Sequence, residues 1–272
     1  MIASSALRFA ATACCLIELC GCRSTAELEA ERFVPPPSAL ASEDARRAAE
    51  EADALWRSPR TEERVQRSYE RALDANAEAT GHQGLIQAAR ACAWLSDNAL
   101  VETNRKVHAL RGAAMAREAE RRLPGRVEPP YYLALNLASL SELYLTPRHL
   151  EEMAQRAQES IQRDEKFDRA GPHRYLGLLH LRTQGRLLVG FGDLDLALKH
   201  LGRAVELFPE DAENRVAFAE ALLADDDADG ARRELEAAGK SPPPADFEEK
   251  HQVWVRRAEE MLRGLPKPAA AQ

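Results

Sequence analysis

The stretch AENRVAFAEALLADDDADGARRELEAAGKSPP, residues 212–243, decides the fold of this chain. Its apolar residues recur at spacings of three and four, which predicts two amphipathic helices joined at Asp225–Asp227. Small side chains at Ala219, Ala231 and Ala238 would let these two helices approach closely. The prolines at the end of the stretch would terminate the second helix. The stretch therefore predicts one antiparallel helix pair.

Its order of large, small and large residues, followed by Ala, large, Ala and Pro, matches the tetratricopeptide repeat, a unit of roughly 34 residues. Second helices of the same kind precede it, one containing Ala197, Leu201 and Ala204, and another beginning near Gly112. A poorer match begins at Val65. One helix pair cannot bury its apolar face alone, so such units stack. We therefore predict an all-α, tetratricopeptide-like α-solenoid of antiparallel helix pairs.

Composition agrees with a helical chain. The 272 residues carry a formal net charge of −7 and only 6% aromatic side chains, which favours helices over a β-sandwich or barrel. An acidic chain without a basic block is also a poor match to nucleic acid. Ser42, Asp193 and Asp211 are expected to cap helices. The predicted helices span 42–57, 61–76, 81–96, 99–122, 129–144, 147–164, 171–183, 193–207, 212–224, 228–238 and 246–263.

The N-terminal residues are expected to be a targeting signal. Arg8 precedes an apolar run that is too short to span a bilayer. The following Leu19-Cys20-Gly21-Cys22 resembles a bacterial lipobox, which makes Cys22 the expected lipidation site; a plain signal peptide is the alternative. Prolines 35–37 predict a semi-extended spacer. The predicted organisation is a lipoprotein signal peptide at 1–21, a lipid-anchored spacer at 22–41, a helical-repeat domain at 42–264 and a flexible tail at 265–272.

The segments 171–179 (GPHRYLGLL), 192–194 (GDL), 204–207 (AVEL) and 131–137 (YYLALNL) resemble the TatT family, the T-component of tripartite ATP-independent periplasmic (TRAP) transporters. The resemblance covers roughly residues 60–240. It implies a lipoprotein that faces the periplasm, forms a homotrimer and associates with the substrate-binding subunit of the transporter. It also implies shelter for an apolar or acidic small ligand. Similarity to bacterial lipoproteins further implies sorting to the outer membrane.

Candidate binding residues follow from the repeat register, because the first helix of each pair lines the concave face of such a stack. Aromatic rings beside two guanidinium groups would suit a ligand with an apolar body and a carboxylate end, or a peptide segment of a partner. Alternatively, the tyrosines belong to the core and Arg174 pairs with an acid. The insertion 183–192 could cover the groove, contact another subunit or pack on its own repeat. The candidates are Tyr131, Tyr132, Asn136, Arg174, Tyr175, Leu178 and Arg182.

Catalytic and metal-binding patterns are weaker. The segment 225–236 satisfies the EF-hand calcium pattern, but Arg232 stands where an apolar residue belongs, and the same letters fit a repeat turn. A solvated acidic turn is favoured, with calcium as the alternative. His173 and His180 lie two helical turns apart, too far to share a zinc ion. Cys92 lies on an apolar stripe and is expected to be a buried side chain. Neither catalysis nor a cofactor is expected.

These observations together predict a lipoprotein that binds without catalysing a reaction. The leading hypothesis is an accessory ligand- or partner-binding component of TRAP-type solute uptake, anchored to the outer membrane and facing the periplasm. The alternative is an envelope scaffold that binds protein segments along its concave face. A deep pocket lined by the candidate tyrosines and Arg174 would favour the first hypothesis, and a shallow groove would favour the second.

Overall fold

The computed structural model describes residues 25–57, 59–144, 147–184, 191–245 and 248–266. This part of the chain contains α-helices, one short 3-10 turn and no strand, so the predicted all-α class is confirmed. The helices are α2 (Thr25–Arg32), α3 (Ser42–Trp56), α4 (Glu62–Asp74), α5 (Gln83–Asn98), α6 (Glu102–Arg122), α7 (Glu128–Tyr144), α8 (Pro147–Arg163), α9 (Phe167–Thr183), α10 (Leu194–Leu207), α11 (Ala212–Ala224), α12 (Ala228–Lys240) and α13 (Glu248–Gly264).

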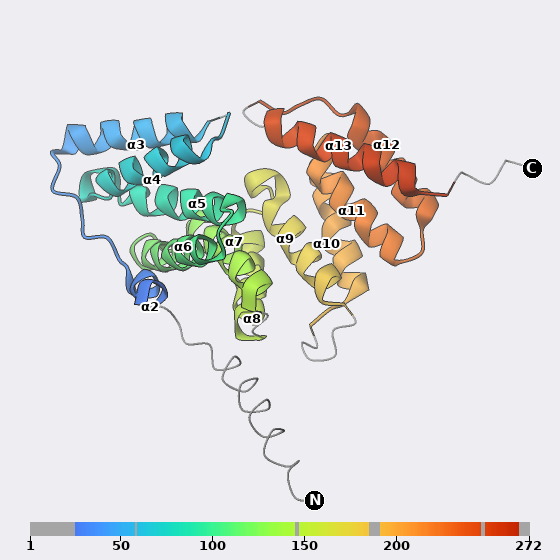
Figure 1. Ribbon diagram of the computed structural model, residues 1–272, viewed down its shortest axis with the longest axis horizontal. Helices are drawn as coiled ribbons and strands as arrows, with labels where there is room; N and C mark the ends of the chain where they lie inside the picture. The colour runs from blue at the N-terminus through green and yellow to red at the C-terminus, as the bar shows by residue number, and fades with distance from the viewer. Residues whose placement is uncertain (1–24, 58, 145–146, 185–190, 246–247, 267–272) are drawn as a thin grey trace, which may run out of the picture.

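From α3 onward, consecutive helices pack in pairs, from α3 with α4 to α11 with α12, and α13 closes the stack against α12 and α11. Odd-numbered helices also contact each other in the runs α3–α5–α7 and α9–α11–α13. They therefore share one layer, and the even-numbered helices form the other. Figure 1 shows the curved stack, with α3 to α8 on one side and α10 to α13 on the other. This is the predicted solenoid.

Small residues hold the helices together as the repeat pattern predicts. Ala197, Ala204, Ala231 and Ala238 are all fully buried. A Cβ atom added to Gly177 would lie 2.5 Å from Cγ of Leu201, so α9 and α10 pack closer there than any larger residue allows. Close approach of paired helices is what allows each pair to bury its apolar stripe against the next.

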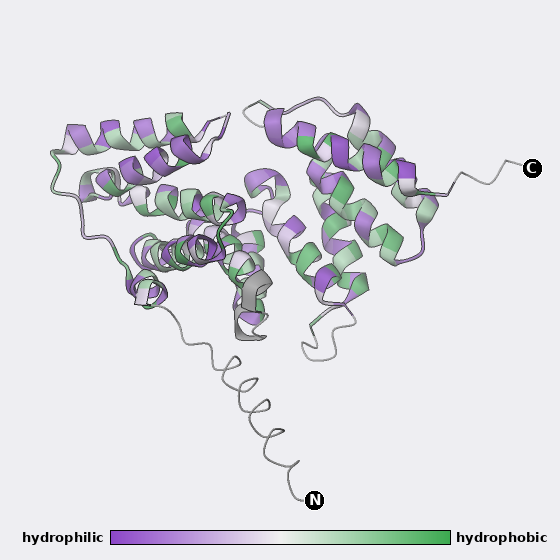
Figure 2. Cartoon of the chain, viewed as in Figure 1, coloured by the Kyte–Doolittle hydropathy of each residue, from purple (hydrophilic) through white to green (hydrophobic). Residues whose placement is uncertain are grey.

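The outer helices α4 and α8 have clearly separated apolar and polar faces, whereas α9 and α11, which are packed on several sides, do not. Figure 2 shows hydrophobic and hydrophilic residues alternating around the helices of both halves of the stack. Within the described residues, no helix combines the length and the apolar character that crossing a membrane requires. The apolar stripes meet in a main core over α3 to α9 and in a second core around Val216 and Leu235 in the C-terminal helices.

The segment expected to be a spacer differs from that expectation in the part that is described. Residues 25–32 form helix α2, which packs along α6 and buries Ala30. The prolines that follow are also held, because Nδ2 of Asn76 donates to the carbonyl oxygens of Pro35 and Pro36 at 3.3 Å. The chain is therefore bound to the domain from Thr25 onward. The predicted signal peptide and Cys22 lie outside the described residues.

The helix caps agree with the sequence in two of three cases. The carboxylates of Asp193 and Asp211 accept hydrogen bonds from backbone N–H groups of α10 and α11, as predicted. Ser42 is not a cap: it is the first residue of α3, after Ala41, and no side chain caps that end. Asp227, one of the candidate calcium ligands, caps α12 by accepting from the N–H of Gly230 at 2.7 Å. Because α12 begins inside that segment, the acidic run is a repeat turn.

Candidate functional site

The odd-numbered layer is the inner, concave one, because its first and last helices, α3 and α13, come together. The backbone N–H of Arg60, between α3 and α4, donates to the carboxylate of Glu249 on α13 at 3.0 Å, across 189 residues of sequence. Figure 1 shows the turn after α3 beside the start of α13. Surface residues of the odd-numbered helices therefore face a common interior, which is the candidate binding face.

At the α3 end of this interior, a tryptophan lies between two arginines. The guanidinium groups of Arg60 and Arg90 lie 4.7 and 4.6 Å from the ring of Trp56, within the range of cation–π attraction. Arg90 also pairs with Asp53 of α3 at 2.7 Å. These contacts tie α3 to α5 and place an aromatic face and charges of both signs on the inner layer.

Four aromatic rings fill the junction between α7 and α9. The ring of Tyr131 lies 5.3 Å from that of Tyr132, 5.2 Å from that of Phe167 and 6.1 Å from that of Tyr175, mostly edge to face. Tyr131 is buried and its hydroxyl donates to the carboxylate of Asp168. Burial raises the pKa of Tyr131, and the negative charge of Asp168 raises it further. The tyrosines therefore join α7 to α9 on the concave side through packed rings.

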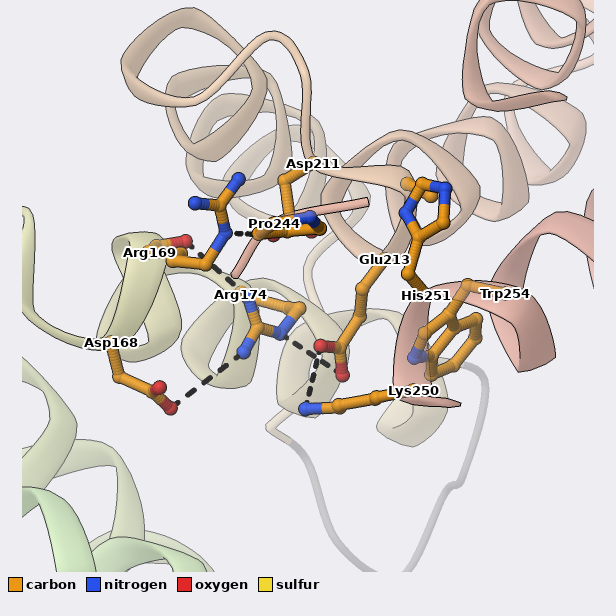
Figure 3. Close-up of a pocket in the computed structure, with 10 residues that line it drawn as sticks. Asp168, Arg169, Arg174, Asp211, Glu213, Pro244, Lys250, His251 and Trp254 are labelled. Atoms are coloured by element: carbon orange, nitrogen blue, oxygen red, sulfur yellow. Dashed lines mark hydrogen bonds and ion pairs between the residues drawn. The ribbon is translucent and has the colours of Figure 1, made fainter. Parts of the chain in front are cut away.

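A network of charges continues the inner layer from α9 to α13, as Figure 3 shows. Nη1 of Arg174 donates to Oδ1 of Asn214 at 2.7 Å, and its Nε lies 3.3 Å from a carboxylate oxygen of Glu213. The other oxygen of Glu213 pairs with Nζ of Lys250 at 2.7 Å. Burial alone would lower the pKa of Arg174, but the charge of Glu213 and other neighbouring acids raises it overall, so this buried side chain stays charged.

This network also holds an unusual turn at the start of α9. Asp168, Arg169 and Ala170 all have left-handed backbone angles, with φ of 46°, 57° and 61°, which cost energy in residues other than glycine. The side chain of Arg169 pairs with Glu210 and Asp211, and its carbonyl oxygen accepts from Nδ2 of Asn214 at 3.0 Å. The ion pairs of Arg169 and the hydrogen bond from Asn214 therefore compensate the strain of the turn.

We call the whole inner surface the inner band: Asp53, Trp56, Arg90, Tyr132, Phe167, Asp168, Arg174, Glu213 and Lys250. It carries charges of both signs, and the charged side chains at its two ends, Asp53 and Lys250, are each 42% exposed. The cavity beside Arg174, formed with α13, has a volume of about 20 Å³, room for one water molecule. The described part of the inner band therefore presents a surface for contact, with no pocket of ligand size at Arg174.

The candidate residues predicted from the sequence differ in their burial and in the partners they already have. Tyr131, Tyr132, Tyr175 and Arg174 do converge at the α7–α9 junction, but Tyr131 and Arg174 are buried and already paired, which matches the packed-core alternative. Asn136 is fully buried and donates to the carbonyl oxygens of Ala89 and Tyr132, so it has a structural role.

The two remaining candidates lie on the same helix with different surroundings. Leu178 packs against the small core around Leu201, whereas Arg182 is exposed. The sequence missed Glu213 and Lys250. Both are ordinary charged residues, and only the repeat register of α11 and α13 could have indicated their position. Residues 185–190 of the apolar insertion lie outside the described residues.

A histidine pair lies between α9 and α10, with His173 buried and His200 half-buried. Nδ1 of His173 lies 2.9 Å from Nδ1 of His200, so one ring must donate to the other, and Nε2 of His173 lies 3.5 Å from Glu165. Burial, together with the charges that His173 and His180 would carry, lowers the pKa of His200 to about 4. Burial also lowers the pKa of His173. The folded chain therefore resists protonation of this pair.

Acidification is expected to destabilise the chain between pH 6.5 and about 4, because the unfolded chain protonates His200 at its ordinary pKa and the folded chain does so only near the lower value. The expected loss from this residue is about 3 kcal/mol. Denaturant unfolding across this pH range, for the parent chain and His200→Asn, would measure it. The variant should lose less stability than the parent, and equal losses would contradict the assignment to His200.

Comparison with known proteins agrees with this geometry. A family model for the tetratricopeptide repeat matches residues 188–248, which contain the stretch that decided the fold. The crystal structure of TTC0263, a thermophilic TPR protein of Thermus thermophilus, superposes with a TM-score of 0.56 at 17% identity, covering 81% of this chain and 100% of that one. The fold is that of a tetratricopeptide-repeat protein.

A second TPR-like neighbour is yeast Tom70, with a TM-score of 0.51 at 15% identity, over 82% of this chain and 41% of Tom70. No characterised protein sequence matches the chain significantly. At these identities the similarity establishes the tetratricopeptide-like fold and nothing finer. The inner band of the chain is thus the concave face of a TPR-like solenoid, the face on which the register of the repeats placed the candidate residues.

Proposed function

We propose that this chain is a lipid-anchored adaptor that binds a protein partner along its inner band. The observation that carries the proposal is the inner band itself, which crosses the odd-numbered helices from Trp56 to Lys250 with aromatic rings and charges of both signs. Such a surface suits an extended partner segment or a folded protein with complementary charges. Cys22 is the proposed attachment point for the lipid, and the outer membrane the proposed site.

The geometry favours a protein partner over a sheltered small ligand. A drug-sized ligand needs a pocket of about 300 Å³ or more. The cavity that includes Arg174 has about 20 Å³. Arg174 is also engaged by Asn214 and Glu213, so a ligand carboxylate would have to displace an existing partner. Binding of an apolar or acidic solute at the tyrosines is therefore not part of the proposal.

As the specific partner we propose the substrate-binding subunit of a TRAP-type transporter, and hence an accessory role in solute uptake. This step rests on the resemblance of the segments at 131–137 and 171–179 to TatT proteins. The alternative is an envelope scaffold that serves another periplasmic assembly through the same face. The two proposals share the inner band and differ only in the protein that occupies it.

Site-specific photocross-linking in the native host would test both. A photoreactive amino acid in place of Lys250, an exposed residue at the α13 end of the inner band, is expected to cross-link a TRAP substrate-binding subunit. The matched control replaces Arg233, an exposed residue on the even-numbered helix α12. Adducts with an envelope assembly protein at position 250 would support the scaffold instead. Equal adducts at both positions, or adducts at 233 alone, would contradict binding by the inner band.

A further inference from the structure

The turn between α5 and α6 exposes two large apolar side chains. Leu100 is completely exposed, at 101% of its reference area, and Val101 is 56% exposed. No other large apolar side chain in the described part of the chain approaches the exposure of Leu100. We call these two residues the apolar tip. An isolated exposed leucine is ordinary on a protein surface, so the position of the tip decides what it means.

Helix α2 fixes that position relative to the N-terminal segment. Glu27 lies 3.9 Å from Nζ of Lys106, and further along, the ring of Phe33 lies 5.7 Å from the guanidinium of Arg111. Residue numbers therefore increase in the same direction along the two segments, so α2 runs parallel to α6. Thr25 must lie at the end of α6 that begins with Glu102, directly after the apolar tip. Figure 1 shows α2 lying alongside α6.

Chain length then restricts where an anchor at Cys22 can be. Three peptide units separate Cys22 from Thr25, and a fully extended chain covers at most ~3.6 Å for each, or about 11 Å in all. An acyl group on Cys22 therefore cannot lie far from the start of α2. The segment that would have let the domain stand away from the membrane is instead packed on α6 and held by Asn76, just after α4.

We infer that the apolar tip enters the membrane that holds the lipid anchor, and that it orients the solenoid on the bilayer. This inference rests on the proposed lipidation of Cys22. Apolar side chains at an interface bury into the boundary between headgroups and acyl chains, and one anchor plus one such contact defines an orientation where the anchor alone does not. The surface that the apolar tip contacts is thus a lipid bilayer.

The charges around the tip indicate that the contact is apolar. The basic residues at this end of α6 are Arg105 and Lys106, and Lys106 is paired with Glu102 at 2.7 Å and lies near Glu27. Helix α2 adds the acidic Glu29 and Glu31. Among the described residues around the tip, acidic side chains therefore outnumber basic ones, and the contact does not depend on anionic lipids. Insertion of the apolar tip should therefore persist at high salt and in vesicles of neutral lipid.

A fluorescent label at the tip would test the inference with the full mature chain. The native cysteines would not interfere with labelling. Once Cys22 is acylated, Cys92 is the remaining thiol of the mature chain. It is buried, and burial raises its pKa to about 12. Leu100→Cys and Val253→Cys each add one accessible thiol, the second on α13, where Val253 is 52% exposed. Both variants are labelled with an environment-sensitive dye and incorporated into vesicles of phosphatidylcholine, which carries no net charge.

The label at position 100 is expected to shift its emission to the blue on vesicles and to be quenched by spin-labelled lipid, whereas the label at 253 should show neither change. A label at 100 that stays as water-exposed as the one at 253, on protein whose mass confirms acylation, overturns the docking and leaves the anchor intact. A mature protein without the acyl mass, or Cys22→Ala that stays membrane-bound and unchanged in mass, overturns the anchor itself and the docking with it.

Discussion

Arg174→Met is expected to destabilise the chain by about 3–5 kcal/mol, because it removes the charged partner from a buried ion pair. Arg174 is 2% exposed, and its guanidinium serves Asn214, Glu213 and the carbonyl oxygen of Arg169 at once. Without it, Glu213 keeps only Lys250, and the left-handed turn at the start of α9 loses one of its supports.

Denaturant unfolding followed by circular dichroism would measure this effect. The matched control is Arg182→Met, the same change on the same helix at an exposed position, where we expect no more than about 0.5 kcal/mol. Combining Arg174→Met with Glu213→Gln should recover part of the loss, because the second change removes the charge that the first leaves uncompensated. A loss for Arg174→Met as small as that of the control would contradict the structural role of this arginine.

Gly84→Ala and Gly239→Ala are expected to have effects of opposite sign, although both glycines lie in helices. A Cβ on Gly84 would lie 2.1 Å from the carbonyl oxygen of Ala72 and 2.6 Å from the backbone N of Asn76, and neither can move without shifting α4 against α5. We expect a loss of about 3 kcal/mol, at the upper end for overpacked sites. A Cβ on Gly239 would meet nothing within 4 Å. There, alanine should stabilise α12 by up to about 1 kcal/mol.

Thermal unfolding of the two variants beside the parent would separate close packing from helix propensity. Propensity alone predicts that both changes stabilise the chain. If Gly84→Ala were as stable as the parent, the close contact between α4 and α5 would be wrong, and with it the tight packing that the small residues impose on the stack.

The sequence predicted the helices well because their signals are local. Spacings of three and four residues, proline positions and the small residues at Ala197, Ala204, Ala231 and Ala238 each report on a single helix pair. Every predicted helix has a counterpart in the structure, and those four alanines are buried. Stacking then follows, because neighbouring pairs repeat the same contact.

The features that the sequence did not predict depend on partners far away in the chain. The sequence predicted an extended segment where helix α2 lies. The helix forms there because α6 provides a surface against which Ala30 packs. Arg174 looked available for a ligand because Glu213 and Asn214 are about forty positions away. The left-handed turn at 168–170 contains no glycine to reveal it, since distant ion pairs supply its stability.

The hydrogen bond between Arg60 and Glu249 limits how this protein could change over evolution. Many repeat proteins lengthen by duplicating a unit, because an open spiral accepts one more turn at either end. Here, inserting another pair ahead of α13 would move Glu249 roughly 10 Å, one helix spacing, away from Arg60 and break the contact. The number of helix pairs is therefore linked to the curvature of the stack, because a different number of pairs would need a different curvature to keep the two ends in contact.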